Sequence, residues 1–192
     1  MSGTKTDRML LLTPPDGWAV IESNIYRATI LSASHIPFLK TIGIKTVVNM
    51  ATSKLRQANA FQTGGIALYQ PCASNNSTTV DEMARSQISD EIAKEALQYI
   101  LDLNNQPLVL TVSIPGSLEV AALVGCLRRV QHWALTSILY EFRLFSPNSA
   151  IYDLNRQLIE RFDISLITFP QNIPEWLQYE QELLLEEEEE EQ

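Results

Sequence analysis

The chain has 192 residues, 45% of them hydrophobic, which is typical of one domain with its own core. The formal net charge is −9, but residues 186–191 are six consecutive glutamates, and without them the charge is only −3. This balance excludes the basic face of a nucleic-acid-binding protein. The two cysteines are far apart in the sequence, which predicts neither a disulfide framework nor a metal site, and no cofactor is expected. No apolar run approaches the ~20 residues of a membrane span, and the start of the chain is polar, so a cytoplasmic location is predicted.

Short apolar segments between turn signals define the first half of the chain. The predicted elements are strands over residues 18–21, 25–27, 44–50 and 66–70, and helices over 34–42 and 52–63. Asn24 lies between the first two strands, which are expected to form a hairpin. Gly43 is expected to end the first helix, because glycine tolerates the left-handed conformation found there.

The second half contains the most apolar elements. A strand is predicted over 108–112 and helices over 81–103, 118–132, 136–145 and 151–162. Strands that alternate with helices predict an α/β fold with a largely parallel sheet, whose functional site lies at the carboxyl ends of the strands. The turn at 113–119 is the prime candidate. Arg128 and Arg129 are interpreted as ordinary solvated charges.

Several motifs together resemble the plant and fungal atypical dual-specificity phosphatases, the branch that includes the oxidant-induced cell-cycle arrest proteins and inositol-pyrophosphate phosphatases. The motifs span residues 24–27, 38–48, 65–70, 105–107, 125–133, 135–136 and 140–143. The resemblance implies the fold of a Cys-based, dual-specificity-like protein tyrosine phosphatase, with a central, mostly parallel sheet flanked by helices. It covers roughly residues 10 to 165.

The family signature is His-Cys-x5-Arg, in which a thiolate attacks phosphorus and the arginine binds the phosphoryl oxygens. Counting back from Gly125 places these positions at Val112, Ser113 and Glu119, with Gly116 as the loop glycine. A serine hydroxyl needs an adjacent base to react, and no histidine is near it in sequence. Reversing a charge ~4 Å from a phosphate replaces an attraction of about 4 kcal/mol by a repulsion.

A second functional segment of the family also differs in this chain. Its Lys-Glu-Pro segment, thought to assist proton transfer, corresponds to Ser77, Thr78 and Thr79. Cys72 starts the same loop and is the other candidate nucleophile, whereas Cys126 is interpreted as a core residue. Together these differences predict that the chain is not an enzyme and that a small phosphate ligand is not expected.

Glu119 and Ser113 also have structural explanations. Glu119 either complements the dipole of the helix that it begins or folds its carboxylate into the loop in place of phosphate. Ser113 is expected to be a turn residue that satisfies loop amides, with nucleophile as the alternative. The predicted domains are a flexible lead at 1–12, a phosphatase-like domain at 13–168, and a C-terminal helix with an acidic tail at 169–192.

The C-terminal helix is expected either to dock on its own domain or to bind a partner through one face. That face consists of Trp176, Tyr179, Leu183 and Leu184. The first functional hypothesis is an inactive scaffold or regulatory subunit, in complex with paralogous phosphatase-like proteins, in oxidative-stress or cell-cycle response. The alternatives are a weakly active phosphatase on phosphotyrosine or inositol pyrophosphates, and an inositol-phosphate sensor without turnover.

Overall fold

The computed structural model describes residues 12–51, 53–71, 88–112, 117–145 and 152–190, and the side chains of 152 and 184–190 are not described. The strands are β1 (Ala19–Glu22), β2 (Ile25–Arg27), β3 (Thr46–Asn49), β4 (Ala67–Tyr69) and β5 (Leu108–Thr111). The α-helices are α1 (Ile36–Ile42), α2 (Ala58–Thr63), α3 (Asp90–Leu101), α4 (Glu119–Val130), α5 (Leu135–Leu144), α6 (Tyr152–Arg161) and α7 (Glu175–Glu190). Short 3-10 turns are η1 (Ala33–His35), η4 (Leu103–Asn105) and η5 (Ile164–Leu166).

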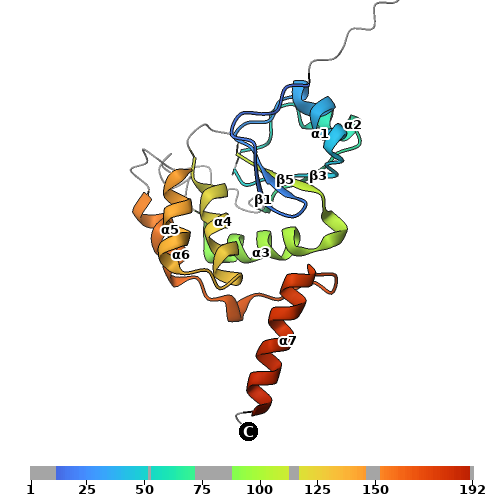
Figure 1. The fold of residues 1–192 in the computed structure, drawn as a ribbon. Helices are drawn as coiled ribbons and strands as arrows, with labels where there is room; N and C mark the ends of the chain where they lie inside the picture. The colour runs from blue at the N-terminus through green and yellow to red at the C-terminus, as the bar shows by residue number, and fades with distance from the viewer. Residues whose placement is uncertain (1–11, 52, 72–87, 113–116, 146–151, 191–192) are drawn as a thin grey trace, which may run out of the picture.

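The described strands form one sheet in the order β1-β2-β5-β3-β4. β1 pairs antiparallel with β2 through the predicted hairpin, and Asn24 has the positive φ of 61° that its turn requires. The other pairs are parallel. Helices α1 and α2 lie together toward one end in Figure 1, whereas α4, α5 and α6 pack side by side. The prediction of a mostly parallel sheet flanked by helices is confirmed.

Two apolar cores lie on the two faces of this sheet, because side chains alternate along each strand. Val109 and Phe61 belong to the smaller core under α1 and α2. Leu108 and Leu110 belong to the larger core with α3, α4 and α6. Every residue of α4 except Arg129 is buried. A helix that is apolar almost all round has to be covered on every side, and the sheet, α3, α5 and α6 do this.

Two predicted helices differ from the observed ones. The helix expected over 52–63 begins only at Ala58, because Gln57 has a left-handed φ of 59° and residues 53–57 form a loop. Within the helix expected over 81–103, residues 81–87 lie outside the described residues. The described part begins after Ser89, whose hydroxyl accepts from the Ile92 amide at 3.3 Å and caps the helix.

The prediction that Arg128 is a solvated charge is wrong. Arg128 is only 5% exposed, and its guanidinium donates to the Ile21 carbonyl oxygen of β1 at 2.9 Å. Its Nε donates to Glu141 of α5 at 2.8 Å, and its guanidinium lies 4.3 Å from the centre of the Trp133 ring. Arg128 therefore connects α4, α5 and the edge strand in the core.

Candidate functional site

The carboxyl ends of β3 and β5 lie side by side. Asn49 pairs with Thr111 in parallel register, and the amide of Met50 donates to the Thr111 carbonyl oxygen at 2.9 Å. The loop after β3 and the loop before α4 therefore start from the same edge of the sheet. In an open α/β sheet this is where ligands bind.

The loop after β3 is fixed by side chains at the strand ends. Asn49 is 3% exposed, and its Nδ2 donates to the Ser53 carbonyl oxygen at 2.8 Å. From the end of β4, Gln70 Nε2 donates to the carbonyl oxygens of Ala51 at 2.8 Å and Ser53 at 3.3 Å. These bonds give the loop a defined path without regular secondary structure.

Two cations follow in this loop. Leu55 is 7% exposed and anchors the segment in the smaller core, so that Lys54 and Arg56 on either side of it face solvent. Because they follow β3 at the sheet edge where β5 also ends, they are candidate phosphate-binding groups. Our sequence interpretation missed them. The available signal was two cations within seven residues of the end of a buried strand. We missed it because a helix was predicted over 52–63.

A third cation near this edge is already engaged. Arg27 ends β2 opposite Leu110 of β5, and its guanidinium stacks on Phe145 with 3.7 Å to the ring centre. Burial lowers the pKa of Arg27 to about 10, and the charge of Glu141 opposes this change. Lys54 and Arg56 are therefore the exposed cations that the loop after β3 offers to an anion.

The predicted signature positions lie partly within the described residues. Val112 is 4% exposed, and its amide donates to the Thr29 carbonyl oxygen at 3.1 Å, which extends β5 toward the loop. Ser113 and Gly116 lie outside the described residues, so their roles stay predictions. Glu119 is the first residue of α4, which places its carboxyl group in the first turn. Backbone amides at such a helix start favour an anion.

Glu119 is far more buried than expected. Glu119 is only 4% exposed, and its Oε2 atom has no hydrogen-bond partner among the described residues. Burial raises the pKa of this carboxyl group above its ordinary value, although hydrogen bonds from its own backbone and from Ser117 act in the opposite direction. The carboxyl group is therefore protonated over a wider pH range than an exposed glutamate.

The remaining predicted site residues are not brought together by the described structure. Ser77, Thr78, Thr79 and Cys72 lie outside the described residues. Cys126 is fully buried in α4, and burial raises the pKa of its thiol far above the ordinary range. The charge of Arg129 opposes this change but does not outweigh burial. Such a thiol does not form the nucleophilic thiolate, so Cys126 is a core residue.

The C-terminal candidates lie at the opposite end of the strands. Leu177 is 2% exposed and docks the first turns of α7 on the larger core, with Trp176 packed beside it. Tyr179 is 61% exposed and Leu183 is 37% exposed. Leu184 belongs to α7, but its side chain is not described. The helix therefore contacts its own domain at its start and leaves Tyr179 and Leu183 available.

Comparison with known proteins identifies close relatives. Residues 12–180 match a family model described as "Tyrosine phosphatase family". A protein of Dictyostelium discoideum named "Probable tyrosine-protein phosphatase DG1060" is 32% identical over 166 residues, which cover 85% of this chain and 95% of that protein. The rice "Inositol diphosphatase DSP1" is 30% identical over 158 residues, which cover 81% of this chain and 68% of that protein.

A solved structure shares the fold. The core catalytic domain of the Saccharomyces cerevisiae PP-IP phosphatase SIW14, crystallised with citrate, superposes with a TM-score of 0.65 and 26% identity. The alignment covers 79% of this chain and 88% of that chain. The expected resemblance to the phosphatase branch and its fold is confirmed.

These findings contradict the prediction that the chain is not an enzyme. The matching family and both relatives, whose alignments cover at least 81% of this chain, are named as phosphatases. Nothing in the described residues shows a loss of activity. The prediction combined Ser113, the negative charge of Glu119 and residues 77–79. Of these, only Glu119 is described, and its burial raises the pKa of its carboxyl group.

The described part of the chain contains no group of three or more histidine, cysteine or acidic side chains placed to hold a metal ion. No helix there has the length and apolar character to cross a bilayer.

Proposed function

Because the chain belongs to the tyrosine phosphatase family, we propose that it is a phosphatase of low activity that acts on inositol diphosphates. The similarity to a rice protein named as an inositol diphosphatase and to the yeast PP-IP phosphatase supports this substrate class. Phosphotyrosine is the competing substrate, because the Dictyostelium relative is named as a probable tyrosine-protein phosphatase.

The observation that carries the proposal is the pairing of β3 with β5. It brings the carboxyl end of β3, which leads to Lys54 and Arg56, to the same sheet edge as the carboxyl end of β5, the strand that precedes α4. An inositol diphosphate carries many phosphoryl oxygens around one ring. Such a ligand needs several donors from different directions, and backbone amides at a helix start together with two flanking cations supply them.

Burial of Glu119 is compatible with this ligand. A protonated carboxyl group carries no charge and can donate one hydrogen bond to a phosphoryl oxygen. Its raised pKa favours this form as an anion approaches, because a neighbouring negative charge raises the pKa further. Protonation upon binding would turn the position that was predicted to repel phosphate into a neutral donor.

The nucleophile is proposed to be Ser113 or Cys72, both outside the described residues. Either would attack the terminal phosphorus and break the bridging P–O bond, so that the inositol phosphate leaves and a phosphoenzyme forms. Water would then hydrolyse this phosphoenzyme, which releases phosphate and restores the nucleophile. Serine lacks the low pKa of an activated thiol, which accounts for the low activity in the proposal. Association with paralogous phosphatase-like proteins and a role in oxidative stress or the cell cycle stay predictions of the resemblance, and a cytoplasmic location stays a prediction from the sequence.

Binding and turnover can be tested separately. Each exposed cation is expected to contribute about 1 kcal/mol to binding in a water-like dielectric. A Lys54→Ala, Arg56→Ala variant should therefore bind an inositol diphosphate about 30-fold more weakly in calorimetry at low salt. The matched control is Lys40→Ala, Lys45→Ala, which removes the same charge from exposed positions elsewhere. Its affinity should change less than about threefold, since distant exposed charges are screened.

Turnover is measured as phosphate release by highly purified protein. Slow release that disappears in Ser113→Ala, Cys72→Ala supports the proposal. Release that persists in this double variant indicates a contaminating enzyme and contradicts it. Equal weakening by both cation variants would show that the ligand responds only to overall charge, and would remove the proposed site.

A further inference from the structure

Helix α7 leaves the body of the protein after its first turns. Figure 1 shows it extending away from the other helices at the far end of the chain, with its later turns beside no other element. Ile173 and Leu177 are buried at 6% and 2% exposure and attach the helix to the core. Tyr179 and Leu183 lie one turn apart on its surface, and both are exposed. An apolar pair at this spacing forms one contact face on a helix.

A groove runs along the base of α7. Its volume is about 780 Å³, and it lies between the helix, the turn of the β1–β2 hairpin and η4. Leu103, Trp176 and Tyr179 provide its apolar lining, and Trp176 also packs against the larger core. Asn24 and Gln106 provide polar groups. A fixed indole ring beside an exposed tyrosine is typical of the anchor sites at protein interfaces.

The charge of this region is one-sided. Residues 162–192 contain ten of the 23 acidic residues of the chain and no lysine, arginine or histidine. Glu175 and Glu182 line the groove, and none of the described residues that line it is basic. Complementary charge favours a basic occupant. It opposes nucleic acids, anionic membranes and a second copy of α7, because each of these is negative as well.

We propose that this groove binds a basic amphipathic segment of another protein. The apolar side chains of that segment contact Leu103, Trp176 and Tyr179, and its lysines or arginines face Glu175 and Glu182. Leu183 extends the apolar contact along the helix. Such a segment matches the helix-in-groove mode of peptide recognition.

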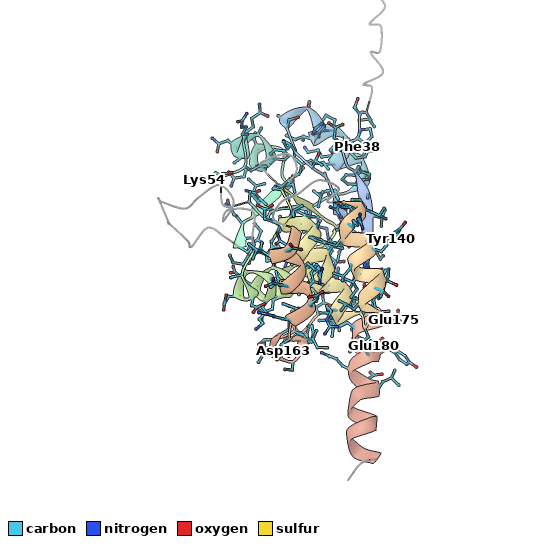
Figure 2. All side chains as sticks on the ribbon, turned by 90° about the vertical axis from the view of Figure 1, so that its left-hand side faces the viewer. Phe38, Lys54, Tyr140, Asp163, Glu175 and Glu180 are labelled. Carbon is cyan, nitrogen blue, oxygen red and sulfur yellow. The ribbon has the colours of Figure 1, made fainter. Side chains whose placement is uncertain are left out.

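The groove is separate from the proposed phosphate site. Its lining includes Asn24 and Gln106, which lie before β2 and β5, at the amino ends of the parallel strands. Figure 2 shows Lys54 toward one end of the molecule and Glu175 and Glu180 toward the other. A partner can therefore bind α7 while the carboxyl edge of the sheet stays open.

The test uses a fluorescent synthetic peptide of leucines and lysines arranged with helical spacing, titrated with the full chain and followed by anisotropy. We expect binding that weakens with added salt. A Tyr179→Ala, Leu183→Ala variant should bind at least about tenfold more weakly, because exposed anchor residues of this kind carry most of a contact's affinity. The matched control is Tyr140→Ala, Leu144→Ala on α5, an exposed pair of the same residues at the same spacing.

Three outcomes would overturn the proposal. The control pair could weaken binding as much as the α7 pair. Removal of residues 186–192 could abolish binding while the α7 pair has no effect, which would assign it to the glutamate run alone. Finally, removal of residues 1–11, which contain Lys5 and Arg8, could raise the affinity more than about tenfold, which would identify that segment as the native occupant.

Discussion

Removing the guanidinium of Arg128 should destabilise the whole domain. In the folded protein Arg128 is only 5% exposed. Its guanidinium donates to Glu141 at 2.8 and 3.2 Å, to Gln131 at 2.7 Å and to the Ile21 carbonyl oxygen at 2.9 Å. Arg128→Met keeps most of the apolar stem and deletes every one of these donors. The Ile21 carbonyl oxygen and the Glu141 carboxylate are then left without this partner.

The magnitude follows from these contacts. Breaking a buried ion pair by removing one partner costs 3–5 kcal/mol, so we take about 3 kcal/mol, the low end, because the Glu141 side chain is 22% exposed. For a domain of this size each kcal/mol lowers the melting temperature by about 2–4 °C. Arg128→Met should therefore melt about 6–12 °C lower than the parent protein.

Urea unfolding followed by far-ultraviolet circular dichroism measures the free energy. Tryptophan fluorescence is avoided because the Arg128 guanidinium lies on the Trp133 ring. The control is Arg156→Met, which removes an exposed pair with Glu160 at 2.8 Å between residues one helical turn apart. Such a pair contributes about 0.3–0.5 kcal/mol. A loss in Arg128→Met no larger than in this control would refute the structural role assigned to Arg128.

Two further substitutions probe α4. Burial raises the folded-state pKa of Glu119 above its unfolded value, so wild-type stability falls as pH rises from the unfolded pKa through the folded one. Glu119→Gln should therefore have a higher melting temperature than wild type at pH 7, and the two melting temperatures should become equal near pH 4. A difference in melting temperature that stays constant between these pH values would contradict the raised pKa of Glu119. Gly125→Ala places a Cβ 2.5 Å from Cδ1 of Ile159 on α6, an overlap that should cost about 1–3 kcal/mol in urea unfolding. Adding Ile159→Val should recover part of that loss, and an unchanged midpoint in Gly125→Ala would show that α6 moves freely.

Local sequence patterns determined most of the elements. The apolar run over residues 108–111 became β5, and the hairpin around Asn24 formed where the turn signal placed it. Gly43 ends α1 with a φ of 83°, because a residue without Cβ adopts this conformation without strain. These features depend on neighbours within a few residues, which is why periodicity and turn residues predict them.

Tertiary structure decided the properties of the charged groups. Arg128 has the sequence context of a surface arginine at a helix end, and only the packing of α5 and β1 around it makes it a buried connection. Glu119 likewise has a raised pKa because burial in the folded domain removes water from its carboxyl group. Lys54 and Arg56 reach the site edge because β3 pairs with β5. Desolvation and strand order depend on contacts across the whole chain, and no local pattern records them.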